Sequence, residues 1–196
     1  MRGRVDLVVA AGALGVLVCL TVWVVLGQPV GDDSVLALRS TNPTLGAVTD
    51  TLLTVVSPPV DILALLGFGV YRSYRRLDGR PLLVAGGAAL ALGITVLGMK
   101  HAIARPFPLP PLPPLAFPSG HTASALVCSG TVVLLSARRS PAAWSAVGVL
   151  TTLVAVALLL RAAHWASDVV GALALGVVLL VGVARATREE RLAPGR

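Results

Sequence analysis

Six long apolar runs, separated by short polar segments, constrain the fold of this chain more than any other feature. A helix needs about 20 mostly apolar residues to cross the hydrocarbon core of a bilayer. Inside that core the backbone has no water to bind, so a single apolar run crosses it as a helix. We therefore expect an all-α, polytopic membrane protein, a six-transmembrane-helix bundle forming one domain over residues 1–196. The expected spans cover about 5–26, 48–71, 81–99, 119–136, 144–160 and 166–183.

The first two runs need separate arguments. The first follows Arg2 and Arg4, as a signal peptide would, but it is longer than the apolar part of a signal peptide, and no cleavage site of small residues follows it. We interpret it as a retained anchor. The second run contains Ser57-Pro58-Pro59 and Asp61, which predicts a kinked span, because proline removes a backbone hydrogen bond.

The composition agrees with a membrane protein. Hydrophobic residues make up 56% of the chain and charged residues only 13%, whereas a soluble domain is about 25% charged. The net charge of +7 comes from short basic clusters between apolar runs, a pattern typical of membrane orientation. We therefore expect no nucleic-acid partner. Cys19 and Cys128 lie inside apolar runs and are interpreted as small buried hydrophobic residues.

The basic residues also predict which side of the membrane each segment faces, because cytoplasmic segments are enriched in Lys and Arg. With the N-terminus in the cytoplasm, twelve of the 16 basic residues fall in cytoplasmic segments. The C-terminus is then cytoplasmic too, and we expect the protein in the cell (plasma) membrane. The remaining cations, on the predicted outer side, are Arg39, Lys100, Arg105 and Arg161.

Ionisable residues gather in three short clusters at the predicted outer ends of the spans. The clusters cover 100–106, 118–121 and 161–168. Ionisable groups at membrane depth are costly and usually functional. A loop with seven prolines joins the first two clusters, and such a loop is stiff and extended. We expect a site on the extracytoplasmic side, with this loop as its rim.

The residue types in these clusters suit a phosphate ester. Lys100 and Arg105 supply positive charge for a phosphate dianion. Ser119-Gly120 precedes an apolar helix, and backbone N–H groups at a helix N-terminus bind anions. His164 and Asp168 are four residues apart and share one helical face, so the carboxylate can orient the imidazole.

With these residues in view, the chain resembles the type 2 phosphatidic acid phosphatase superfamily, which also includes the vanadium haloperoxidases. The resemblance rests on Pro118-Ser119-Gly120-His121, on the downstream His164-x-x-x-Asp168 and on Lys100 at the end of the third span. Motif order and the six-span layout match as well, so the resemblance covers most of the chain. It implies a lipid phosphate substrate and hydrolysis of a phosphomonoester or diphosphate, with no cofactor and no metal.

The resemblance also implies a role for each matching residue. His164 would attack phosphorus to give a phosphohistidine, and Asp168 would orient it. His121 would protonate the leaving group. The remaining residues would hold phosphate oxygens: Lys100, Ser119 and the Gly120 amide.

Two arginine positions depart from the family pattern. The first family motif has an arginine seven residues after the lysine, where this chain has Phe107, and the nearby arginine is Arg105. The third motif has an arginine six residues before the nucleophilic histidine, where this chain has Leu158, and the nearby arginine is Arg161. Because an arginine side chain is long, we expect Arg105 and Arg161 to bind phosphate from their shifted positions.

Other interpretations remain open. Singly, Lys100 and Arg161 are explained by snorkelling to the headgroups, and Ser119 by helix capping. The displaced arginines are also compatible with a degenerate family member or a transporter that binds a lipid phosphate without hydrolysing it. An intramembrane serine protease is a weaker alternative, because Ser119 follows a proline. The candidate substrates are polyprenyl diphosphate, a polyprenyl-phosphoryl sugar phosphate, phosphatidate and phosphatidylglycerol phosphate.

Overall fold

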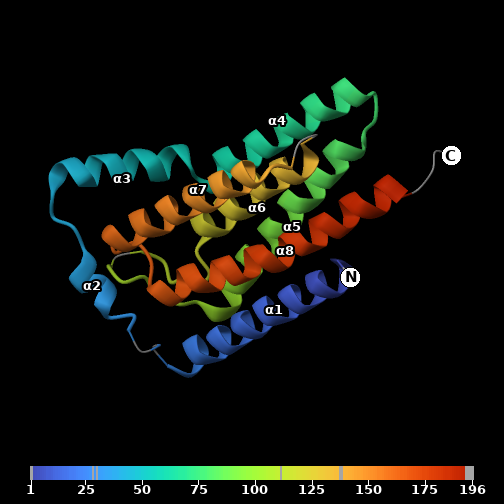
Figure 1. Cartoon of the computed structure of the whole chain (residues 1–196). Helices are drawn as coiled ribbons and strands as arrows, with labels where there is room; N and C mark the ends of the chain where they lie inside the picture. The colour runs from blue at the N-terminus through green and yellow to red at the C-terminus, as the bar shows by residue number, and fades with distance from the viewer. Residues whose placement is uncertain (1, 28, 30, 111, 137–138, 193–196) are drawn as a thin grey trace.

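The computed structural model describes residues 2–27, 29, 31–110, 112–136 and 139–192. Over these residues the chain is all-α, with its longer helices running side by side (Figure 1). The helices are α1 (Arg2–Leu26), α2 (Ser34–Leu38), α3 (Pro43–Val55), α4 (Pro58–Arg76), α5 (Arg80–Ile103), α6 (Gly120–Leu135), α7 (Pro141–Leu160) and α8 (Ala166–Leu192).

Local sequence fixes where several helices begin. Asn42 caps α3, with its Oδ1 accepting from the backbone N–H groups of Thr44 (2.9 Å) and Leu45 (3.1 Å). Ser140 caps α7 in the same way, accepting from Ala143 N at 3.2 Å. In both helices a proline follows at the first position, where no backbone donor is needed.

The spans observed differ from the six expected. By length and composition, α1, α5, α7 and α8 are each able to cross a membrane. The expected second span is a pair of helices, α3 and α4, bent by 43° at Ser57-Pro58, where proline ends the hydrogen-bond ladder. Helix α6 is apolar but only 16 residues long, shorter than the about 20 residues that a lipid-exposed span needs. The described chain thus has four candidate spans, or five with the bent pair, and the count of six is not confirmed.

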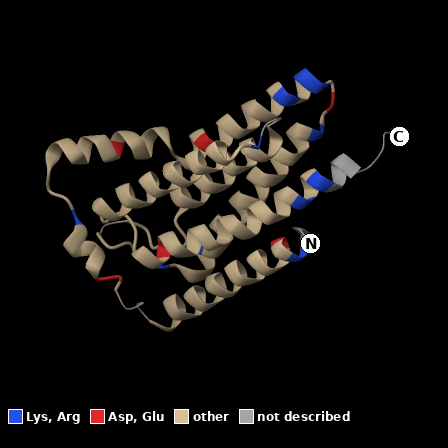
Figure 2. Ribbon diagram, viewed as in Figure 1, with Lys and Arg blue, Asp and Glu red and all other residues tan. Residues whose placement is uncertain are grey.

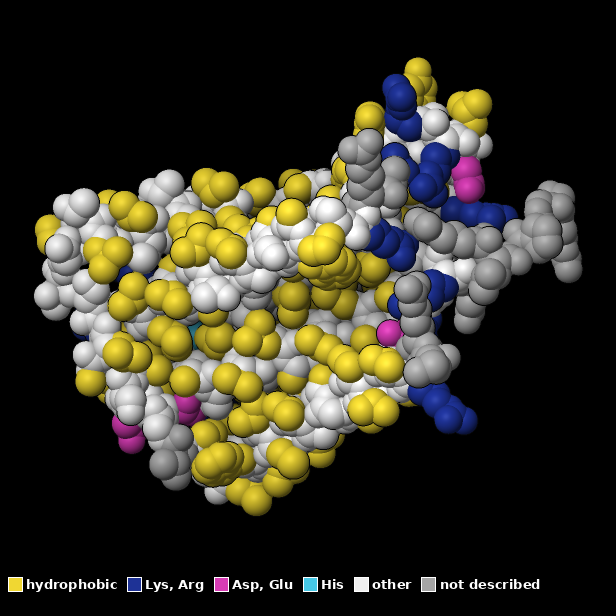
Figure 3. All heavy atoms as spheres, in the orientation of Figure 1, with side chains coloured by type: hydrophobic (Ala, Val, Ile, Leu, Met, Phe, Trp, Pro, Cys, Tyr) yellow, Lys and Arg dark blue, Asp and Glu magenta, His cyan; other side chains and the backbone are white. Residues whose placement is uncertain are grey.

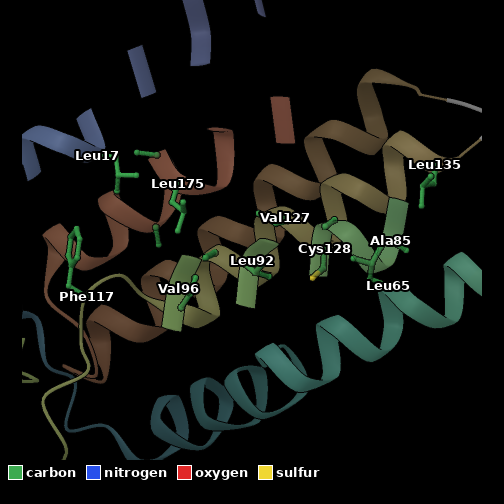
Figure 4. Close-up of a cluster of buried hydrophobic side chains, with 14 residues drawn as sticks. Leu17, Leu65, Ala85, Leu92, Val96, Phe117, Val127, Cys128, Leu135 and Leu175 are labelled. Carbon is green, nitrogen blue, oxygen red and sulfur yellow. The ribbon is translucent and has the colours of Figure 1, made fainter. Parts of the chain in front are cut away.

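The short helix α6 lies at the centre of the bundle. It packs against α4, α5, α7 and α8, while α1 packs along the outside of α8. Figure 4 shows the buried apolar cluster that joins α6 to α1, α4, α5 and α8, with Val127 and Cys128 from α6 among its members. Neighbouring helices bury most of the residues of α6. A helix enclosed in this way does not need the length of a lipid-exposed span.

Glycines bring α6 and α8 into close contact. A Cβ atom added at Gly176 would lie 2.6 Å from Leu126, and one at Gly130 would lie 2.7 Å from Leu180. At Gly171 the same atom would lie 2.6 Å from the ring of Phe117, which is fully buried just before α6. Small residues of this kind let membrane helices approach closely. They hold α6 against α8 along its length, and the contact at Gly171 joins the start of α8 to the residue before α6.

The surface of the bundle is apolar along its length and charged at one end. Figure 3 shows hydrophobic side chains over the visible face and Lys and Arg side chains gathered at one end. Figure 2 places them at the start of α1, the end of α4, the start of α5 and the end of α8. The chain is an all-α, multi-pass membrane protein.

Candidate active site

The three sequence clusters meet at the end of the bundle opposite most of the basic residues. The Ser119 N–H donates to the carbonyl of Asp168 at 3.1 Å, which joins the start of α6 to the start of α8. The loop after α5 closes on itself through Ala116 N and Arg105 O, 2.9 Å apart. Three segments distant in sequence therefore share one location, as the sequence predicted.

His164 and Asp168 form a buried pair. The Nδ1 atom of His164 lies 3.2 Å from Oδ2 of Asp168, and the same oxygen accepts from the Trp165 N–H at 3.0 Å. The Asp168 side chain is fully buried, and His164 is 5% exposed. A carboxylate held in this way fixes the orientation of the imidazole and stabilises its cation.

The surroundings of His164 favour its neutral form. His164 lies in the connection between α7 and α8, outside the candidate spans. Burial, the largest influence, lowers its pKa from the ordinary 6.5, and Asp168 opposes that shift without reversing it. The Lys100 ammonium lowers the pKa of His164 further, whereas a hydrogen bond to the Ala116 backbone raises it. A neutral imidazole is the form able to act as a nucleophile.

His121 and Lys100 lie on neighbouring helices beside this pair. Both are half-buried, and both interact electrostatically with His164. The Lys100 ammonium donates to the carbonyl of Leu115 in the proline-rich loop. His101, for which the sequence suggests no role, is exposed.

Ser119 and Gly120 form the start of α6. The Ser119 hydroxyl is completely buried and accepts from the Thr122 N–H at 3.4 Å. A Cβ atom at Gly120 would make only ordinary contacts, 3.6 Å from Pro58 and 3.9 Å from Lys100 Cε. Packing therefore does not require glycine here. The gap left by the missing side chain has room for a methyl group and is bounded by Pro58, Lys100 and Val96.

Phe107 occupies the position at which the family pattern has an arginine. Its ring centroid lies 5.2 Å from that of His164 and 5.8 Å from the Lys100 ammonium. An aromatic ring, which attracts a cation only through its face, thus contacts both the histidine and the lysine. Phe107 supplies no positive charge there.

Arg105 faces carboxylates. One terminal nitrogen donates to Asp168 Oδ1 at 2.5 Å and to the Ser167 hydroxyl at 2.7 Å, and the other donates to Asp32 Oδ2 at 2.6 Å. Its side chain is only 7% exposed. The guanidinium lies on the side of Asp168 that faces away from His164, because the two groups use different carboxylate oxygens. Its expected role as a phosphate ligand stays a prediction.

Arg161 points toward α3. Its Nε lies 2.9 Å from Asp50 Oδ1, and its Nη1 would lie 3.1 Å from a Cβ atom at Gly46. Both partners of this pair are substantially exposed, at 38% and 56%. The structure does not place the Arg161 guanidinium beside His164, and its role as a phosphate ligand also stays a prediction.

Two polar residues of the cluster were not singled out from the sequence. Asp32, in the segment between α1 and α2, is 1% exposed and accepts from the Ser167 N–H (3.0 Å) and hydroxyl (2.6 Å). Asp32 is 135 residues from Ser167 in the chain. No local spacing pattern connects the two, and the fold alone reveals their contact.

Comparison with known proteins identifies the family. The family model of the PAP2 superfamily matches residues 80–192, which is more than half of the chain. The chain belongs to the PAP2 superfamily. The match includes Lys100, the start of α6 and the His164–Asp168 pair, and it confirms the resemblance predicted from those residues.

A solved PAP2 structure shares the fold. It is the structure described as the first transmembrane PAP2 type phosphatidylglycerolphosphate phosphatase from Bacillus subtilis. The likeness covers 98% of this chain and 96% of that chain, with a TM-score of 0.64 and 18% sequence identity. The helical arrangement, including the N-terminal helices outside the family match, is thus one that a PAP2 protein adopts. No curated protein matches this chain.

Proposed function

We propose that this PAP2 protein is a membrane lipid phosphate phosphatase that hydrolyses a phosphomonoester or diphosphate through a phosphohistidine intermediate. The observation that carries the proposal is the buried His164–Asp168 pair, 3.2 Å apart, with His121 and Lys100 beside it. A protein that only bound phosphate would need cations. It would not need a carboxylate-supported imidazole together with a second histidine.

In the proposed reaction the neutral imidazole of His164 attacks phosphorus, and the bond from phosphorus to the leaving oxygen breaks. His121, in its protonated form, gives its proton to that oxygen, and Asp168 stabilises the positive charge that develops on His164. Water then attacks the phosphohistidine while His121 takes up a proton. Inorganic phosphate leaves, and His164 returns to its neutral form.

The phosphate would lie at the N-terminus of α6. The Cε atom of Lys100 lies 3.9 Å from the position of a Cβ atom at Gly120, so an anion bound at this helix end would meet a cation and the positive end of the helix. Phosphoryl transfer depends chiefly on such charge stabilisation and positioning. Lys100, Ser119 and the Gly120 amide are the proposed ligands, joined by Arg105 or Arg161 only if those side chains leave their present carboxylate partners.

The proposed topology has both termini in the cytoplasm, six crossings and an extracytoplasmic active site in the cell membrane. Most of the described Lys and Arg residues lie at the end of the bundle opposite the site (Figure 2), which supports this orientation. The fifth and sixth crossings would be the bent α3–α4 pair and the enclosed helix α6. A lipid substrate then meets the site at the outer surface of the bilayer.

A second candidate is a lipid-phosphate binder without hydrolytic activity. The ion pairs of Arg105 and Arg161 with aspartates favour it, because each of these guanidinium groups is already engaged. Against it stands the Asp168 carboxylate, which keeps its Oδ2 directed at the histidine ring.

The test is phosphate release by the purified protein in detergent. The panel contains phosphatidate, phosphatidylglycerol phosphate, polyprenyl diphosphate and a polyprenyl-phosphoryl sugar phosphate. His164→Ala is the inactive variant, and His101→Ala, at an exposed histidine of the same region, is its matched control. We expect release that disappears in His164→Ala and persists in His101→Ala. Binding of one lipid without release by the unmutated protein would favour the second candidate, and equal release by both variants would refute the mechanism.

A further inference from the structure

Asp32 belongs to a buried charge network behind the His164–Asp168 pair. The Arg105 guanidinium bridges two carboxylates, with Asp32 at 2.6 Å and Asp168 at 2.5 Å. The Ser167 hydroxyl lies between them, donating to Asp32 Oδ2 at 2.6 Å and accepting from Arg105 at 2.7 Å. Each of these side chains is at least nine-tenths buried.

The backbone brings Asp32 to this position from outside the family match. The chain turns at Gly31, whose φ of +92° favours glycine. Asp32 Oδ1 then accepts from the Ser167 N–H at 3.0 Å, while Asp168 accepts from the Trp165 N–H. The first N–H groups of a helix have no partner within the helix. Asp32 therefore supplies a hydrogen-bond acceptor for the N–H of Ser167, the residue before Asp168 at the start of α8.

The charges of the network determine how strongly Asp168 acts on His164. Asp32, Arg105 and Asp168 together carry one net negative charge. Without Asp32, Arg105 would neutralise Asp168 alone, and the imidazolium form of His164 would lose its counter-charge. In a buried site such an effect is little screened by water.

We propose that Asp32 is a positioning residue of the proposed phosphatase: it shares the charge of Arg105 and fixes Ser167, so that the Asp168 carboxylate remains oriented toward His164 and retains its negative charge. The proposal rests on the proposed function for its effect on turnover. The partners of Asp32 are Arg105 and Ser167, not His164 or the start of α6. Asp32 therefore acts on His164 indirectly, through Arg105 and Asp168.

The experiment is a double-mutant cycle of Asp32→Asn and Arg105→Gln, with Asp33→Asn as the matched control at the exposed neighbouring carboxylate. The titration of His164 is followed by NMR of histidine-labelled protein in detergent. The chain has three histidines, so His164→Ala assigns the signal. Lys100, His121 and Asp168, the charged or titratable groups facing His164, remain unchanged in every variant of the cycle.

The network predicts the direction in which each substitution shifts the pKa of His164. Asp32→Asn removes a negative charge and lowers the pKa of His164; Arg105→Gln removes a positive charge and raises it. The double variant restores one net negative charge and returns the titration toward that of the unmutated protein. We expect kcat in Asp32→Asn to fall about 10–100-fold, by analogy with the outer-shell partners of metal-binding histidines, with little change in KM. Asp33→Asn, at a carboxylate that contacts neither Arg105 nor Ser167, should leave kcat and the His164 titration unchanged.

The results of this cycle distinguish a positioning role of Asp32 from a purely structural role. They also distinguish failure of this role from failure of the proposed phosphatase function. If Asp32 only tethers the segment before α2, Asp32→Asn will lower the unfolding temperature and leave kcat and the His164 titration unchanged, which would overturn the proposal. If Asp32→Asn does not fold, Arg105→Gln and the double variant still carry the test, because the first should raise the pKa of His164 and the second should return it toward that of the unmutated protein. If the unmutated protein shows no His164-dependent turnover, the proposed function fails, whereas the titrations still decide the network.

Discussion

The carboxylate of Asp168 uses its two oxygens on two different partners: Oδ2 lies 3.2 Å from Nδ1 of His164, and Oδ1 lies 2.5 Å from Nη1 of Arg105. The Trp165 N–H provides a third hydrogen bond, to Oδ2. A side chain held by three donors has little rotational freedom. The orientation of His164 is therefore set before any substrate binds, which is the condition for efficient nucleophilic attack.

Asp168→Asn should abolish most of the activity while leaving binding of a lipid phosphate largely intact. The amide has nearly the shape of the carboxylate, but it carries no charge to stabilise the cation formed on His164. In a serine protease the equivalent Asp→Asn substitution costs about 10⁴ in kcat, because the histidine then takes the wrong tautomer. Single-turnover kinetics would measure the loss, with Asp78→Asn, an exposed acid at the other end of the bundle, as the control. A kcat within about threefold of the unmutated value would contradict this role.

The pH dependence of turnover should have its acid limb below pH 6.5. Burial lowers the pKa of His164 from that ordinary value, so the neutral, nucleophilic form persists to more acid pH and is lost only as pH falls through the lowered pKa. The stability of the fold changes with pH in the same direction. The unfolded chain binds a proton at His164 near pH 6.5, whereas the folded chain does so only at lower pH. The contribution of His164 to the free energy of unfolding is therefore complete above pH 6.5 and declines below it. A profile of kcat/KM, which reports the free enzyme, with an acid midpoint above 6.5 would contradict the assignment.

The sequence predicted the parts of the fold that depend on local pattern. Long apolar runs predicted the helices α1, α5, α7 and α8, because a span needs a minimum length of apolar sequence. The prolines at 58 and 59 predicted a kink, and a bend of 43° is found there. The count of six stays a prediction, because α6 has only 16 residues and hydropathy alone does not distinguish a helix enclosed by its neighbours from one exposed to lipid.

In the site, spacing predicted the pair of His164 and Asp168, because residues four apart on a helical turn face the same way. Spacing gave no indication that Arg105 would pair with Asp168, or that Arg161 would pair with Asp50, in place of the phosphate that we expected both to bind. Those contacts depend on where α3 and the segment before α2 lie in three dimensions.

Gly120→Ala should impair phosphate binding without destabilising the fold. A Cβ atom there would make only ordinary van der Waals contacts, so we expect the unfolding temperature to stay the same or rise slightly, given that alanine is favoured over glycine in helices by about 0.5–1 kcal/mol. The added methyl group would occupy the space beside Lys100 that we assign to phosphate. Phosphate release should fall at least about tenfold, mainly through KM. Unchanged turnover would place the phosphate elsewhere.

Chelation should leave turnover unaffected. Among the described residues, the histidines, cysteines and acids form no group of three or more that is able to hold a metal ion. The charge of the phosphate would instead be met by Lys100 and the α6 N-terminus. Phosphate release in the presence of excess EDTA should equal that of the untreated protein. Loss of activity that returns on addition of Mg²⁺ would require a different mechanism.

Gly171→Ala should destabilise the fold at the junction that positions the site. The new Cβ atom would lie 2.6 Å from the fully buried ring of Phe117, which is held between α8 and the start of α6. Overpacking of this kind costs about 1–3 kcal/mol. Gly182→Ala is the matched control on the same helix, because nothing lies within 4 Å of a Cβ atom there. Thermal unfolding in detergent should show a lower midpoint for Gly171→Ala than for Gly182→Ala. Activity should fall with it, because a displaced Phe117 moves Ser119 away from the Asp168 carbonyl; equal midpoints for the two variants would show that Phe117 repacks without cost.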